Sequence, residues 1–122
     1  MFADTDFILA LIKETDWLKQ NALRLMGKYK GQIRTSISVM IELALLCGRM
    51  KRPLLPTFAN VFEFTEVDET TYSICLTAGL YVDKHNINVF DAFHAAYCGD
   101  DKILSSDDIY EKVGIERVKL EN

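Results

Sequence analysis

The sequence has few of the features that mark a membrane, secreted or multidomain protein. No apolar run approaches the roughly 18 residues that a membrane-spanning helix needs, and the N-terminus has no basic segment followed by a cleavage site. Only two prolines and six glycines occur among 122 residues, and no low-complexity tract or long-period repeat is present. These absences predict one domain over residues 1–122, a cytoplasmic location and no membrane contact.

Cysteine pairs and excess positive charge are lacking as well. Three cysteines lie far apart in apolar sequence without metal-ligand spacing, which predicts buried reduced thiols at Cys47, Cys75 and Cys98. The formal net charge of −4 argues against a broad cationic surface for nucleic acids. A role on RNA or DNA would need metal ions or a local basic patch. The candidate basic residues, which solvated helix ends explain equally well, are Lys28, Lys30, Arg34, Arg49, Lys51 and Arg52.

Short strand-like segments alternate with helical ones along the whole chain. Strands are expected near residues 1–3, 32–35, 64–67, 102–104 and 116–120. Helices are expected near residues 7–12, 17–29, 39–50, 54–62, 69–84 and 89–97, with caps that include Ser36, Asp68 and Asn88. This alternation predicts a three-layer α/β/α fold with a short-stranded, mainly parallel central sheet.

Acidic residues stand at four positions where a strand ends or a helix begins, and three of them are turn or cap positions. Asp4 follows the first strand, Asp91 comes three residues after the candidate cap Asn88, and Asp107 lies in a Ser-Ser-Asp-Asp turn. Each has a structural explanation, because a carboxylate near a helix start caps free N–H groups or remains in a solvated turn. Any one of them alone is therefore weak evidence for a site.

Glu42 is more informative. It is the only charged residue between Ser38 and Cys47 in an otherwise apolar helix. Burying its carboxylate costs several kcal/mol unless a positive group compensates. The helix N-terminus supplies about 0.3–1 kcal/mol, whereas a metal ion supplies much more, so both explanations stay open.

The four acids together predict a metal site. In a parallel sheet, the turns after successive strands can face one crevice, where several carboxylates would repel each other unless cations were present. Oxygen ligands without a histidine or cysteine set favour Mg²⁺ or Mn²⁺ over Zn²⁺. His94, one turn after Asp91, is either an orienting or RNA-contacting group or, as is more common, a packed helix histidine.

The order of these motifs resembles that of PIN-domain ribonucleases, especially VapC-type toxins of toxin–antitoxin pairs. The motifs are Asp4 after the first strand, Glu42 early in an apolar helix, Asp91 in Phe-Asp-Ala-Phe-His-Ala-Ala and Asp107 in Ile-Leu-Ser-Ser-Asp. The resemblance implies a pocket that binds one or two Mg²⁺ or Mn²⁺ ions and hydrolyses RNA. It makes Asp4, Glu42 and Asp91 the core acids and Asp107 the fourth, with Asp108 as an alternative.

The resemblance also suggests supporting residues and partners. Ser105 and Ser106 fall where the family often has a hydroxyl near the metal, and Asp6 stands where many members carry Asn. Expected partners are an RNA substrate, a small antitoxin and a second copy in a homodimer. The apolar segment 54–62 is a candidate antitoxin interface, and the aromatic residues interpreted as core or dimer contacts are Trp17, Phe58 and Phe62.

Two other functions compete with the nuclease. A PIN-like fold could keep its acids and serve as a binding or scaffold module. A receiver-type phosphoacceptor domain also gathers acids around Mg²⁺, but its acceptor aspartate and lysine are not found at suitable positions.

Overall fold

Five short parallel strands form the centre of the protein, which a computed structural model describes over residues 1–121. The strands are β1 (Phe2–Ala3), β2 (Arg34–Ser36), β3 (Glu66–Asp68), β4 (Ile103–Ser105) and β5 (Arg117–Lys119). Their spatial order is β3-β2-β1-β4-β5, and every pairing is parallel. The chain therefore builds the sheet outward from β1 in one direction and later returns to its other side. Such a reversal of strand order marks a ligand crevice in open α/β sheets.

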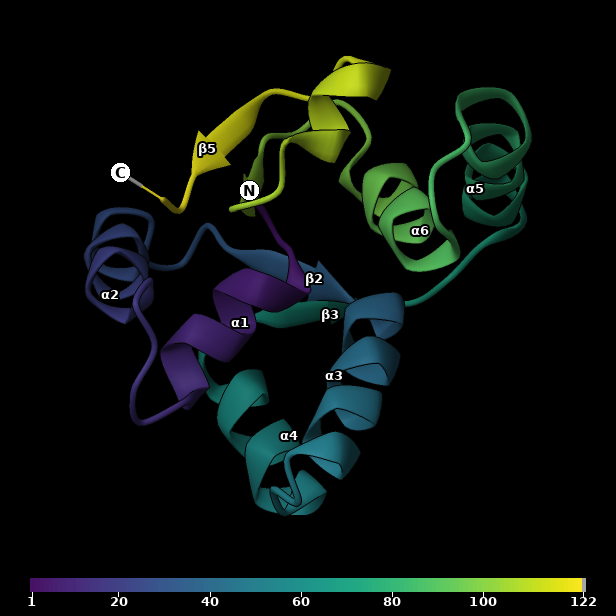
Figure 1. Cartoon of the computed structure of the whole chain (residues 1–122). Coiled ribbons are helices and arrows are strands. Elements are labelled where there is room, and N and C mark those ends of the chain that lie inside the picture. Colours follow the sequence, from purple (N-terminus) through teal and green to yellow (C-terminus); the bar gives the residue numbers. More distant parts are fainter. Residues whose placement is uncertain (122) are drawn as a thin grey trace.

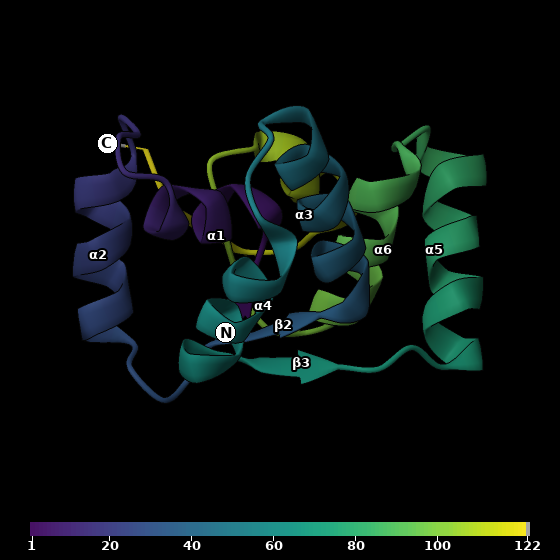
Figure 2. The same cartoon turned by 90° about the horizontal axis from the view of Figure 1, so that it is seen from below.

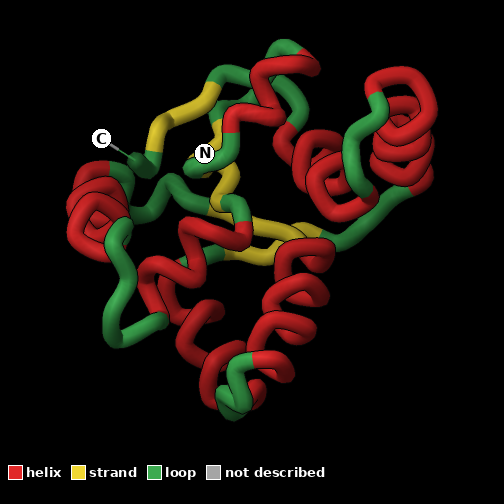
Figure 3. The backbone as a smooth tube through the Cα atoms, viewed as in Figure 1, coloured by secondary structure: helices red, strands yellow, loops and turns green. Residues whose placement is uncertain are grey.

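Helices cover the sheet, as the alternating pattern predicts (Figure 1). They are α1 (Thr5–Ile12), α2 (Lys19–Lys28), α3 (Ile37–Arg49), α4 (Leu54–Phe64), α5 (Tyr72–His85), α6 (Val89–Cys98) and the 3₁₀ helix η1 (Asp108–Val113). In Figure 1, α1, α3 and α4 lie below β2 and β3, whereas α5 and α6 lie to the upper right. Figure 2 shows α2 and α5 at opposite ends of the molecule, and Figure 3 shows β2 and β3 among helices, whereas β5 lies at an outer edge. The predicted PIN-like α/β fold is confirmed.

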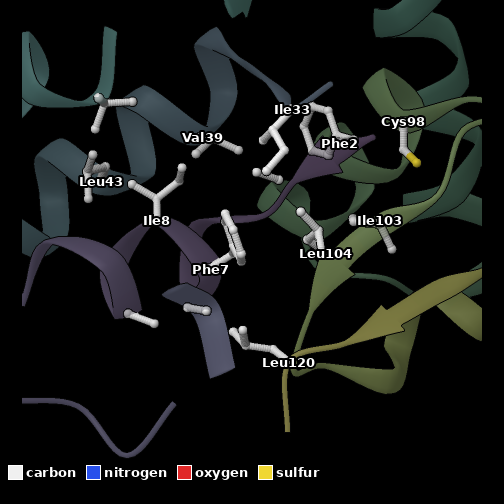
Figure 4. Close-up of a cluster of buried hydrophobic side chains, with 14 of the residues drawn as sticks. Phe2, Phe7, Ile8, Ile33, Val39, Leu43, Cys98, Ile103, Leu104 and Leu120 are labelled. Carbon is white, nitrogen blue, oxygen red and sulfur yellow. The ribbon is translucent and has the colours of Figure 1, made fainter. Parts of the chain in front are cut away.

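The central strands β1, β2 and β4 are largely buried, and apolar side chains dominate β1 and β4, whereas β2 has the polar sequence Arg-Thr-Ser. Phe2, Ile103 and Leu104 are fully buried, and they pack with α1 and α3 in one core (Figure 4). A smaller cluster of Ala78, Ile87 and Ala92 joins α5 to α6. The core therefore fixes β1, α1 and α6 relative to one another, and these are the elements that carry Asp4 and Asp91.

Two predicted helix starts are confirmed by their caps. The Ser36 hydroxyl accepts the Val39 N–H before α3, and the Asn88 side chain accepts the Asp91 N–H before α6. Gly99 ends α6 with a φ of +58°, a conformation that favours glycine. The sequence therefore locates the start of α6, and with it Asp91, correctly.

The region around β3 differs from the prediction. Helix α4 continues to Phe64, so the strand begins at Glu66, and Asp68 lies in β3 instead of capping the next helix. Thr71 is the cap of α5. Asp68 pairs instead with the guanidinium of Arg34 at 2.7 Å, a contact that local sequence does not reveal.

Arg34, one of the basic residues considered for RNA contact from the sequence, has a structural role in the folded protein. It also pairs with Asp101 at 3.3 Å and donates hydrogen bonds to the carbonyl oxygens of Tyr97 and Cys98. These bonds join β2 to β3 and to the end of α6. The guanidinium is therefore occupied by protein acceptors.

Two of the three aromatic residues expected to be core or dimer contacts lie outside the core. Trp17, which precedes the start of α2 at Lys19, is 80% exposed, and Phe62 is 56% exposed on α4, whereas Phe58 packs against the core. A dimer contact stays a prediction for Trp17 and Phe62. The expectation that all three cysteines are buried is wrong. Cys75 is exposed on α5, whereas Cys47 and Cys98 are buried.

Across the described residues, every helix is too short or too polar to cross a membrane.

Candidate active site

Asp4 joins the sheet to the first helix. It follows β1 directly and is the N-cap of α1, with Oδ1 accepting the Thr5 N–H at 2.7 Å. Its Oδ2 accepts hydrogen bonds from the hydroxyls of Ser105 and Tyr110, both at 2.9 Å. Only 5% of the residue is exposed, so a solvated turn is ruled out. Asp4 is therefore a buried carboxyl group held from three directions.

A cavity of about 530 Å³ opens beside Asp4. The four predicted acids Asp4, Glu42, Asp91 and Asp107 all line it, although they come from four separate parts of the chain. The remaining lining residues are Thr5, Asp6, Ser106, Asp108, Arg117 and Glu121. Ser105 is buried next to Asp4, and His94 is buried next to Glu42. The predicted site residues are thus brought together.

His94 connects Glu42 to Asp4. Its Nε2 lies 3.0 Å from Glu42 Oε1 and 3.6 Å from Asp4 Oδ1, and its Nδ1 lies 2.9 Å from the Ser38 hydroxyl. The ring is fully buried, so the predicted packed histidine is confirmed and contact with RNA is excluded. Burial alone would raise the pKa of Glu42, but hydrogen bonds from His94 and Thr5 outweigh it and lower that pKa. Burial likewise acts to lower the pKa of His94, yet its acidic neighbours raise it.

Asp91 reaches the cavity from the first turn of α6. Its carboxylate accepts hydrogen bonds from the Asn88 amide and, at 3.3 Å, from the Tyr110 hydroxyl. Burial raises the pKa of Asp91, the Asn88 hydrogen bond lowers it, and the charge of Asp107 raises it further. Asp91 therefore takes part in the N-terminal cap of α6 through Asn88, and it also feels the charge of a second acid, Asp107.

Tyr110 is a member of the site that sequence reasoning missed. It lies on η1, its side chain is fully buried, and its hydroxyl touches both Asp4 and Asp91. Burial, together with the two carboxylates, raises the pKa of this phenol far above its ordinary value. The residues that surround Tyr110 in the sequence do not distinguish a tyrosine that faces acids from one that only packs in the core.

Asp6 is fixed on one oxygen only. Its Oδ2 accepts hydrogen bonds from the backbone N–H and the hydroxyl of Ser106, and from the Ser105 hydroxyl at 3.4 Å. Its Oδ1 is buried and has no hydrogen-bond partner within the described residues 1–121. Burial raises the pKa of Asp6, and the charge of Asp107 adds to the rise. A buried carboxylate oxygen without a donor is an observation that a cation would explain.

The outer rim of the cavity includes Arg117 and Glu121, which the sequence analysis does not predict as site residues, beside the predicted Asp107. The Arg117 guanidinium binds both carboxylate oxygens of Glu121, at 2.7 and 2.9 Å, and its Nε lies 3.3 Å from Glu111. Asp107 caps η1 by accepting the Ile109 N–H. The one arginine among the residues that line the cavity is therefore engaged by Glu121 and Glu111, while the basic partner of the inner acids Asp4 and Glu42 is His94.

The inner site has the properties of a divalent-cation site. Burial, with the charge of Asp6, raises the pKa of Asp4 to about 7, although His94 opposes the rise. Ligand atoms of Asp4, Glu42 and His94 lie within 4.8 Å of one another. Since the His94 nitrogens are occupied by Glu42 and Ser38, the available donors are carboxylate oxygens. Such oxygens fit Mg²⁺ or Mn²⁺.

Comparisons with known proteins agree with this geometry. VapC20 from Mycobacterium tuberculosis, a toxin described as cleaving the sarcin–ricin loop, has a TM-score of 0.84 at 22% identity, covering 97% of this chain and 98% of that one. A toxin–antitoxin complex from Klebsiella pneumoniae gives 0.76 at 11% identity, covering 99% and 98%. VapBC-1 from nontypeable Haemophilus influenzae gives 0.68 at 16% identity, covering 98% and 96%. A search of curated protein sequences finds no match. A family profile described as PIN domain matches residues 1–116, and the chain therefore belongs to the PIN domain family.

Proposed function

We propose that this protein is a metal-dependent endoribonuclease and the toxin of a toxin–antitoxin pair. The observation that carries the proposal is the meeting of Asp4, Glu42, Asp91 and Asp107 around one cavity in a PIN domain. The similarity to VapC20, a toxin that cleaves an RNA loop, supports the substrate class.

The proposed ligands are the carboxylates of Asp4, Glu42, Asp91 and Asp107. Asp107 is preferred to Asp108 because its backbone N–H donates to the Ser105 hydroxyl, which itself donates to Asp4, and this link to the inner acids supports the choice. A bound Mg²⁺ or Mn²⁺ ion would lower the pKa of an attacking water and stabilise the charge that develops on the scissile phosphate. The ion would also allow an acidic cavity to accept a polyanion.

The chain's own residues would keep the ligands in place. His94 orients Glu42 and faces Asp4, while Ser105 and Ser106 fix Asp4 and Asp6. His94 and Ser105 are fully buried, whereas Ser106 also lines the cavity, and hydrogen bonds of this kind orient carboxylates for a metal. A receiver-type phosphoacceptor is set aside because the chain belongs to the PIN family, and retention of every acid argues against a pure scaffold.

The first test is RNA cleavage by the purified protein with Mn²⁺, Mg²⁺ or EDTA, using structured and unstructured RNAs. We expect cleavage with either ion and none with EDTA. A thermal melt without RNA supplies a separate readout, because a ligand that binds only the folded state raises the melting temperature. An ion present at about 100 times its Kd should stabilise the fold by about 2.7 kcal/mol. Metal binding without cleavage of any RNA would favour the scaffold.

The proposed antitoxin partner has a candidate docking surface on α4. Leu55 is 81% exposed and Phe62 is 56% exposed on this helix, and apolar side chains left in solvent mark interaction sites. We expect Phe62→Glu to weaken binding of the cognate antitoxin by about 2 kcal/mol, as measured by calorimetry. Tyr72→Glu, an exposed aromatic on distant α5, is the matched control. Equal antitoxin affinity in both variants would reject α4 as the interface. The expected homodimer stays a prediction from the family resemblance.

A further inference from the structure

The Tyr110 hydroxyl bridges two acids that come from opposite ends of the chain. Its oxygen lies 2.9 Å from Asp4 Oδ2 and 3.3 Å from Asp91 Oδ1. Within residues 1–121, it is the only group that hydrogen-bonds both carboxylates. The aromatic ring packs in the main core, and only the hydroxyl meets the acids.

The hydroxyl completes the orientation of each carboxylate. On Asp4, Oδ1 is held by the Thr5 N–H and Oδ2 by Tyr110 and Ser105. On Asp91, Oδ2 is held by Asn88 and Oδ1 faces Tyr110. A tyrosine supplies one proton and two lone pairs, and it is neutral at pH 7. Its single proton is therefore shared between the two contacts, the shorter one to Asp4 at 2.9 Å and the longer one to Asp91 at 3.3 Å, and it adds no charge to either acid.

We propose that Tyr110 is a positioning residue for the cation site, which sets Asp91 relative to Asp4 before the ion binds. This inference rests on the proposed function, because it concerns the same ion. The core alone requires only the ring, since phenylalanine fills the same apolar volume. A buried hydroxyl is costly unless it has partners, and here both partners are proposed metal ligands.

The test compares Tyr110→Phe with Tyr97→Phe. Tyr97 is also a buried α6-to-core tyrosine, but its hydroxyl has no hydrogen-bond partner and it does not line the acidic cavity. Mn²⁺ affinity is measured by calorimetry on the full chain without RNA. Tyr110→Phe should weaken that affinity roughly 10-fold, within the range for contacts behind a metal ligand, and lower kcat for RNA cleavage with KM unchanged. Tyr97→Phe should leave all three quantities at wild-type values.

Asp4→Asn separates failure of this inference from failure of the proposed function. Loss of Mn²⁺ binding in Asp4→Asn with wild-type binding in Tyr110→Phe would overturn the role of Tyr110 and leave the nuclease standing. No Mn²⁺ binding by the wild type would overturn both.

A second measurement keeps the hydroxyl and does not depend on the Phe variant folding. Fluorine NMR of protein carrying 3-fluorotyrosine in place of Tyr110 should show its resonance shift when Mg²⁺ is added. The same label in place of Tyr97 should not shift. An unchanged resonance at position 110 in protein that binds Mg²⁺ would overturn the inference.

Discussion

Asp4→Asn should lower metal-dependent RNA cleavage by roughly 100-fold or more, because it removes a carboxylate expected to contribute about 3 kcal/mol or more to transition-state stabilisation through the ion. The fold should survive, since Asn is as good an N-cap as Asp for the Thr5 N–H. With its oxygen on the Thr5 N–H, its amide nitrogen takes the place of Oδ2 and can donate a hydrogen bond to the hydroxyl oxygen of Ser105 or Tyr110. Activity and stability are therefore expected to separate.

The metal-free variant should melt no lower than the wild type at about pH 8. Burial raises the pKa of Asp4 to about 7 in the folded protein, so between its ordinary value and about 7 the folded state binds more protons than the unfolded state. Stability then falls as the pH rises through this window. The Asn side chain of the variant does not titrate, so the variant does not lose stability by burying a charge at position 4.

The measurement pairs cleavage assays with thermal melts, each with Mn²⁺ and with EDTA. Asp83→Asn, an exposed aspartate on α5, is the matched control and should retain both cleavage and the Mn²⁺ shift. Full activity in Asp4→Asn would contradict the assignment of Asp4 as a ligand. Unfolding of the variant in EDTA would instead mean that the charge itself is structural.

The sequence predicts best the acids that local pattern places at the end of a strand or the start of a helix. An apolar run that breaks at Asp4 indicates the end of β1, and Asn88 locates the start of α6 and hence Asp91. Parallel strand ends then bring these positions to one edge, which is a property of topology and not of any one residue. The sequence alone therefore predicts that the four acids share one site, and in the structure they line one cavity.

The sequence fails where a residue's role depends on a distant partner. Asp68 looks like a helix cap until Arg34 is found beside it, and Tyr110 looks like a core aromatic until Asp4 and Asp91 converge on its hydroxyl. The start of α2 is misplaced for a different reason, because helical spacing does not show that the helix begins at Lys19, after Trp17. In each case the missing information is a contact or a boundary that tertiary packing decides.

Leu104→Ala should destabilise the protein by about 3 kcal/mol, within the range for truncating a buried leucine. Leu104 is fully buried in β4, where it is paired with Ala3 of β1 and Val118 of β5. Since small domains unfold with only about 5–15 kcal/mol, this is a large share of the total. Leu76→Ala on exposed α5 is the control, with an expected change within about 0.5 kcal/mol.

Chemical denaturation measures both variants, and a loss below about 1 kcal/mol for Leu104→Ala would mean that the sheet core relaxes around the cavity. The same variant also tests whether packing in the core positions the acids of the proposed metal site.

Ser105 follows Leu104 directly in β4 and donates its hydroxyl hydrogen bond to Asp4. If β4 keeps its register, folded Leu104→Ala protein should bind Mn²⁺ with wild-type affinity, and cleavage should fall only with the folded fraction. Weaker binding by folded protein would show instead that packing beneath the strand positions the carboxylate above it.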